Sequence, residues 1–230
     1  MMLRTLAVFS LALLVNGLRA EEKAAPSDAL SSAMQKLAAG DDDWAYTQVF
    51  RRTDCSTGDT VARFDPSKPA GSQWQLLKLR GRTPTEAEAA KWCRRREQDV
   101  NQTDSRALVE LLDLEHARIL SQDTEHASFE IPLKKNTIAH IPAENFVAYA
   151  DVDCEQAALE KLSIVLRQTV RLIGGIAQIQ TAKGEMVFKS VGEDGTRPAY
   201  IVASGSGQAL FRKLNRSAEI IFTDQRRVKS

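Results

Sequence analysis

The sequence has few of the residues that usually mark a reaction centre. Its three cysteines form no Cys-x-x-Cys pair, and its histidines, His116, His126 and His140, have neither HxH nor HxxxH spacing. Neither a thioredoxin-type redox site nor a zinc site is therefore indicated. The Ser-Gly-Ser-Gly run at 204–207 lacks the glycine two residues before a serine that a nucleophile elbow needs. We expect no catalytic residue, no metal and no cofactor, and so a protein that is not an enzyme.

Long apolar runs and an excess of one charge are also missing. The formal net charge is +1, and a nucleic-acid partner would need a basic face, so none is expected. Beyond the first 20 residues, no apolar run approaches the roughly 20 residues that cross a bilayer. No membrane span is expected after that point.

The first 20 residues are typical of a cleavable secretory signal peptide. Arg4 supplies a positive start, residues 6–15 are apolar, and Ala20 is a small residue suited to cleavage after it. No cysteine lies nearby, so lipid attachment is not indicated. The expected mature chain, residues 21–230, has a length that favours a single domain.

Cys55, Cys93 and Cys154 make an odd set for an exported chain. One disulfide and one thiol are expected in an oxidising compartment, and the sequence leaves the pairing open.

The N-terminal half alternates amphipathic helices with short strands. A helix is expected over 29–39, with Leu30, Met34, Leu37 and Ala38 on one face. A capping box with Thr83 and Glu86, and Pro84 at the first helical position, begins a second helix that runs to 98. Between these helices the period-2 pattern predicts strands at 44–52, 60–64 and 73–79.

The second half is dominated by alternating strands. After a short helix at 105–114, one long strand is expected over 170–180, bending at Gly174 and Gly175. The other expected strands are 117–121, 127–133, 146–152, 159–167, 184–191, 198–205, 208–213 and 218–224. This pattern predicts an α+β fold: a strongly curved antiparallel sheet, part-closed as a half-barrel, with the helices covering its concave face.

Aromatic and aliphatic side chains are the candidate ligand-binding residues. Those that could line an apolar ligand cavity are Trp44, Tyr46, Phe50, Trp74 and Leu76. The alternative is that they fill the core between sheet and helices.

Residues 63–92, RFDPSKPAGSQWQLLKLRGRTPTEAEAAKW, carry a family resemblance. The stretch is similar to a segment of exported proteobacterial proteins of uncharacterised function, in which a (Y/F)DPS-P-G-W-LL strand turn precedes a DGR-PT-E helix start. Arg80 stands where that group usually has an acidic residue before the glycine. The order of elements resembles the periplasmic carrier and receptor superfamily of outer-membrane lipoproteins. The resemblance implies a periplasmic half-barrel with a helical lid that binds a lipid or acyl chain.

Two hypotheses of function follow. The first is a periplasmic, non-enzymatic protein that binds a lipid, or the acyl chain of a lipoprotein, in an apolar cavity. The second is a structural or regulatory protein-interaction module of the cell envelope, which uses a sheet edge or the concave face for a protein partner.

Overall fold

A computed structural model describes residues 26–39, 43–53, 57–98, 105–134, 137–138, 141–172, 177–191, 196–209 and 212–228. The predicted signal peptide, including its cleavage after Ala20, lies outside the described residues, as do Cys55 and His140. Within the described part of the chain, no helix is both long and apolar enough to cross a membrane.

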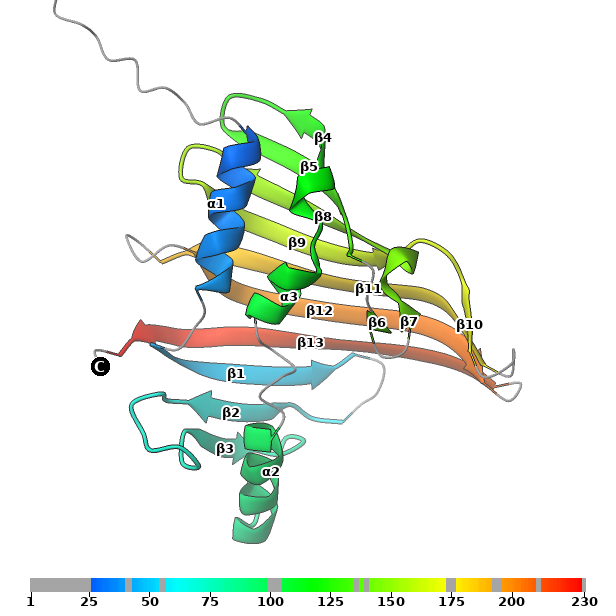
Figure 1. Cartoon of the computed structure of the whole chain (residues 1–230). Helices are drawn as coiled ribbons and strands as arrows, with labels where there is room; N and C mark the ends of the chain where they lie inside the picture. The colour runs from blue at the N-terminus through cyan, green and yellow to red at the C-terminus, as the bar shows by residue number, and fades with distance from the viewer. Residues whose placement is uncertain are drawn as a thin grey trace, which may run out of the picture.

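One open antiparallel sheet of 11 strands makes up most of the fold (Figure 1). Its order is β3-β2-β1-β13-β12-β11-β9-β8-β5-β4, and β10 pairs with β11. The sheet is not closed, because β3 and β4 stand at opposite ends. Its strands are β1 Trp44–Arg52, β2 Thr60–Phe64, β3 Trp74–Lys78, β4 Arg118–Gln122, β5 His126–Pro132, β8 Phe146–Asp153, β9 Ala158–Leu166, β10 Val170–Leu172, β11 Ala177–Ser190, β12 Thr196–Ala209 and β13 Arg212–Arg227.

The three α-helices that the structure describes lie on one face of this sheet. The helix α1 (Pro26–Ala38) lies over β8 and β9, α3 (Ser105–Leu111) packs beside α1, and α2 (Glu86–Gln98) lies against β3 at the other end (Figure 1). We call this side of the sheet the helical face. The structure also describes two 3-10 turns, η2 (Leu114–His116) and η3 (Ala143–Asn145), and the small pair β6 (Thr137–Ile138) and β7 (Ile141–Pro142).

A single row of apolar residues crosses the helical face from strand to strand. Strand register places each member directly beside the next, from β4 at one end to β1 near the other. Because side chains alternate along a strand, all members of the row point to the same side. In sheet order, from β4 to β1, the row is Ile119, Phe129, Ala150, Leu162, Met186, Ile201, Ile220 and Phe50.

The core lies where α1 covers this row. Leu30 and Met34 of α1 are 2% and 0% exposed and pack with Phe129, Ala150 and Leu162. The helix face predicted from the sequence is confirmed for Leu30 and Met34. Two small residues that the prediction omitted, Ala29 and Ala33, are buried beside them and allow close approach to the sheet.

The opposite face of the sheet is lined by cross-strand ion pairs, and we call it the polar face. Arg51 bridges Asp59 and Glu219, with N–O distances of 2.9 Å and 2.7 Å. Glu185 accepts from Lys183 at 2.7 Å and from Lys161 at 3.3 Å. The hydrogen bond from Lys183 lowers the pKa of Glu185.

The α+β class and the helices gathered on one face are as predicted.

The start of α2 differs from the predicted capping box. The helix begins at Glu86, and its reciprocal cap joins Thr85 and Glu88: the Glu88 amide donates to Thr85 Oγ1 (3.3 Å), and the Thr85 amide donates to Glu88 Oε2 (2.9 Å). Pro84 therefore precedes the helix rather than opening it. The Thr-x-x-Glu pattern occurs twice in this stretch, and the second copy forms the cap, in which Glu88 also binds Arg82.

Two strand predictions in the second half were wrong. The expected strand over 170–180 is two antiparallel strands, β10 and β11, with Leu172 beside Ala177, so the chain reverses where a bend was predicted. The expected strand at 208–213 spans the reversal between β12 and β13, where Ala209 pairs with Arg212. In both cases the apolar alternation continues on each side of a reversal, so periodicity alone could not locate it.

The described cysteines form no disulfide with each other. Cys93 lies on α2 beside β3, whereas Cys154 is buried at the end of β8. Seven strand spacings separate β3 from β8, a distance of about 30 Å, whereas a disulfide needs Cα atoms within about 7 Å. Of the three pairings open in the sequence, Cys93 with Cys154 is therefore excluded.

Candidate functional site

An aromatic cluster holds the α2 end of the helical face together. Tyr46 on β1 lies beside Phe64 on β2, which lies beside Trp74 on β3, and ring centroids are 5.0–6.0 Å apart within this set. Phe222 of β13 contacts Tyr46 at 5.4 Å, and Trp92 of α2 contacts Trp74 at 5.7 Å. Mostly tilted and edge-on packing of this kind fills the space between the rings.

Arg96 fixes α2 to this cluster by its charge. Its guanidinium lies 5.0 Å from the centroid of the Trp74 ring, and its Nη2 donates to Gln48 Oε1 at 3.4 Å. The helix therefore contacts β3 through an aromatic ring and a cation, and none of the described side chains of α2 is buried.

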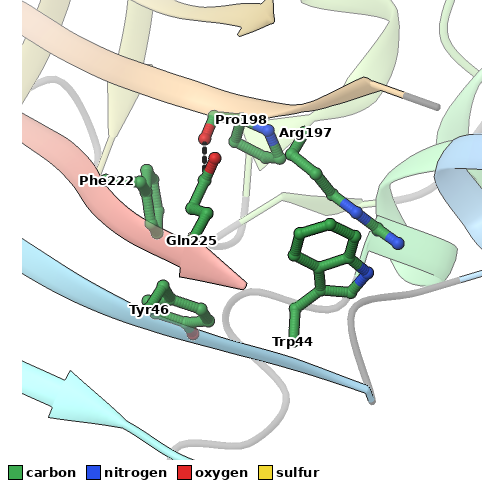
Figure 2. Close-up of a pocket in the computed structure, with 6 residues that line it drawn as sticks. All are labelled: Trp44, Tyr46, Arg197, Pro198, Phe222 and Gln225. Carbon is green, nitrogen blue, oxygen red and sulfur yellow. Dashed lines mark hydrogen bonds between the residues drawn. The ribbon is translucent and has the colours of Figure 1, made fainter. Parts of the chain in front are cut away.

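A small internal space lies next to the cluster (Figure 2). Trp44 is 5% exposed, and the Arg197 guanidinium lies 4.6 Å from the centroid of its ring. Gln225 Nε2 donates to the Pro198 carbonyl at 2.6 Å across the space. Its volume is about 20 Å³, which suits a single water molecule and not an acyl chain.

The structure separates the five residues predicted to line a ligand cavity. Trp44 and Tyr46 border the same small space, and Tyr46 contacts Trp74. Leu76 is buried, with 6% of its surface exposed, and lies on β3, two strands away from β1. Phe50 is 37% exposed, at the end of the apolar row. Aromatic neighbours fill the space around Tyr46 and Trp74, and the ligand-binding role of the five stays a prediction.

The middle of the helical face carries a second candidate site that the sequence did not reveal. Along the apolar row, exposure rises from 1% at Leu162 to 37% at Phe50. Between them, Met186, Ile201 and Ile220 are half-buried. We call Met186, Ile201, Ile220 and Phe50 the central strip. It crosses β11, β12, β13 and β1, between the strands that α1 contacts, β8 and β9, and the strand that α2 contacts, β3.

Small residues give the central strip a shallow border. Gly184, Ala203 and Ala218 pair side by side in the neighbouring row of the same face. A Cβ added at Gly184 would meet nothing within 4 Å, so space lies above Gly184. The alternation of each strand was visible in the sequence, but the register that joins four strands into one strip was not.

Two of the described histidines each lie beside one carboxylate. His116 Nδ1 lies 2.9 Å from Asp113 Oδ2, a hydrogen bond that raises the pKa of His116, and His126 Nδ1 lies 3.3 Å from Glu160 Oε2. Among the described residues, no group of three His, Cys, Asp or Glu side chains could hold a metal ion. The central strip is an apolar surface on which another molecule could bind.

Comparison with solved structures gives a distant likeness. No family model matches the sequence, and no curated protein matches it significantly. The chain is similar to a solved structure described as the crystal structure of MucB in complex with MucA(peri). The similarity covers 89% of this chain and 99% of that chain, with 9% sequence identity and a TM-score of 0.23. A likeness this low supports no inference, and the resemblance to lipoprotein carriers stays a prediction.

Proposed function

We propose that the protein is a non-enzymatic interaction module of the cell envelope, exported by its leader to the periplasm, which binds a segment of a protein partner on the central strip. The observation that supports this most is the strip itself. Met186, Ile201, Ile220 and Phe50 lie side by side across four strands and keep part of their surface in water. Contiguous apolar surface of this kind is typical of binding sites.

The geometry favours a protein segment over an enclosed small ligand. The half-barrel curvature predicted from the sequence would make the helical face concave, and the helices at both ends would flank a bound segment. An apolar helix or strand would cover all four side chains of the strip at once. An acyl chain needs a deeper apolar pocket to leave water, and the space beside Trp44 and Tyr46 is too small for one.

Site-specific photocrosslinking in cells tests the proposal. A photoreactive amino acid at Ile220 is expected to give one stoichiometric protein adduct, identified by mass spectrometry. The matched control is the same amino acid at Ser204, an exposed residue of β12 on the polar face. The substitution Ile201→Asp should remove the Ile220 adduct, because it places a charge in the middle of the strip. Equal adducts at both positions would contradict the proposal.

A lipid or acyl chain remains the second candidate, favoured by the open space above Gly184 beside the strip. Native mass spectrometry of protein purified from the periplasm separates the two. A copurifying lipid that Ile201→Asp removes would support the lipid, and an empty protein with a stoichiometric protein adduct would support the interaction module.

A further inference from the structure

The strand β4 is an uncovered end of the sheet. Among the strands that the structure describes, β4 pairs only with β5, and all five residues of β4 are exposed. Ile119 and Leu120 are 49% and 56% exposed, more than any other large apolar side chain that the structure describes. An end strand leaves backbone N–H and C=O groups without partners, and natural proteins usually blunt such strands with lysine or proline. Here β4 has neither lysine nor proline; it is short, has a bulge at Leu120, and carries one charged residue, Arg118, which is paired with Glu130.

The other end of the sheet is protected differently. Trp74 of β3 lies under Trp92 and Arg96 of α2, and Leu76 is 6% exposed. A helix that covers an end strand is one of the recognised ways to prevent unwanted pairing. The contrast indicates that β4 is kept open while β3 is covered.

The chain around β4 is acidic. Residues 112–133 contain five carboxylates and one arginine, a net charge of −4 with histidine neutral. The single arginine, Arg118, is bound to Glu130, which also accepts from Arg167. Glu115 and Glu125 are exposed on either side of β4. Pairing with β4 of a second copy would bring two such segments together, and like charges oppose it.

We propose that β4 accepts an added β-strand from a protein partner, and that the added segment is extended and alternates apolar with basic residues. Main-chain hydrogen bonds would extend the sheet beyond β4. The apolar side chains would continue the row that Ile119 now ends, and the basic ones would face Glu115 and Glu125. This inference rests on the proposed function in that the partner is a protein, but it uses a different surface from the central strip.

Peptide binding to the full mature chain tests the inference. The probe is a fluorescein-labelled peptide of alternating lysine and valine, followed by anisotropy, with amide shifts of β4 followed by NMR. A glutamate–valine peptide and a lysine–valine peptide with alternate backbone nitrogens methylated should each bind about tenfold more weakly, because they lose charge complementarity and ladder hydrogen bonds respectively.

Variants of the protein locate the site. Ile119→Thr with Leu120→Thr removes apolar surface while keeping strand propensity, and should weaken peptide binding about tenfold. The matched control is Leu214→Thr, since Leu214 is 45% exposed but lies on β13, six strands along the sheet from β4. Ile201→Asp, which alters the central strip, should also leave the affinity for the lysine–valine peptide unchanged. A wrong assignment of the β4 site can therefore be told apart from a wrong assignment of the central strip.

Three outcomes would overturn the inference. They are no binding of the lysine–valine peptide, equal loss of binding in the β4 variant and in Leu214→Thr, or a concentration-dependent dimer in sedimentation that the β4 variant abolishes. The last would show that a second copy occupies the strand.

Discussion

The two ends of the helical face are covered by helices of equal length that are held in different ways. Both α1 and α2 have 13 residues. In α1 four apolar residues are at most 2% exposed, whereas none of the described side chains of α2 is buried. The α1 end is therefore the stable part of the fold, and α2 is attached through Trp74 and Arg96. Segments with few buried contacts open at low free energy, so α2 should be released before the α1 end unfolds.

The largest effect is expected from the centre of the α1 end. Phe129 is 2% exposed and packs in the core under α1. Phe129→Ala should lower the free energy of unfolding by about 4 kcal/mol, because it removes apolar burial and leaves a cavity. Urea unfolding followed by circular dichroism measures this. The neighbouring row residue Ile119, which is exposed, is the control, and Ile119→Ala should cost less than about 0.5 kcal/mol.

A smaller, local effect is expected at the α2 end. Trp74→Ala removes ring contacts to Tyr46, Phe64 and Trp92 and the cation contact to Arg96. The expected loss is about 2 kcal/mol, below that of a fully buried ring because Trp74 is half-buried. Hydrogen exchange should accelerate in α2 while α1 amides stay protected. Equal acceleration in both helices would show that the two ends unfold as one unit.

Local pattern was enough to predict much of the fold. The strand at 44–52 was predicted with the bounds of β1, and 60–64 with those of β2, because alternating aromatic or β-branched residues are bounded by polar turns. The helix of α1 followed from the spacing of Leu30 and Met34. These features depend only on neighbours in sequence.

Features that depend on register could not be predicted in the same way. Alternation correctly placed Phe50 on the same side of β1 as Tyr46, but only the pairing of Phe50 with Ile220 shows that it belongs to the central strip. The reversal between Leu172 and Ala177 interrupts a run that looks continuous in sequence. The strip joins residues from four strands, and a one-residue slip in any pairing would turn its side chain to the other face.

Arg96 offers a finer test of how α2 is attached. Arg96→Ala should lower the stability of α2 by about 0.5–1 kcal/mol, since the guanidinium lies over the Trp74 ring at a partly exposed site. Exchange rates of the α2 amides measure the change. Arg95→Ala is the matched control, because Arg95 is exposed on the same helix and shares its position near the C-terminal end. Equal effects of the two would assign the role of Arg96 to the helix dipole instead of the ring.

The smallest effect concerns the cap at the start of α2. The hydrogen bond from Arg82, with that from the Thr85 amide, lowers the pKa of Glu88 to about 2. Folding therefore favours the ionised form of Glu88. Its contribution to the stability of the folded state is complete above the ordinary pKa of 4.5 and is lost as the pH falls from there toward 2. Amide exchange in the first turn of α2 should accelerate over that pH range, after correction for the intrinsic rate.

Arg82→Gln separates the ion pair from the cap. In this variant an NMR titration should find the pKa of Glu88 raised toward its ordinary value, and the loss of protection should begin at higher pH. Thr85 still donates its amide to Glu88 in that variant, so some lowering of the pKa should remain. A Glu88 pKa that Arg82→Gln leaves unchanged would show that the amide of Thr85 alone holds the carboxylate. In either case the amides of α1, which does not contact this cap, should stay protected from exchange over the same pH range. Protonation of Glu88 would then loosen α2 without loosening α1.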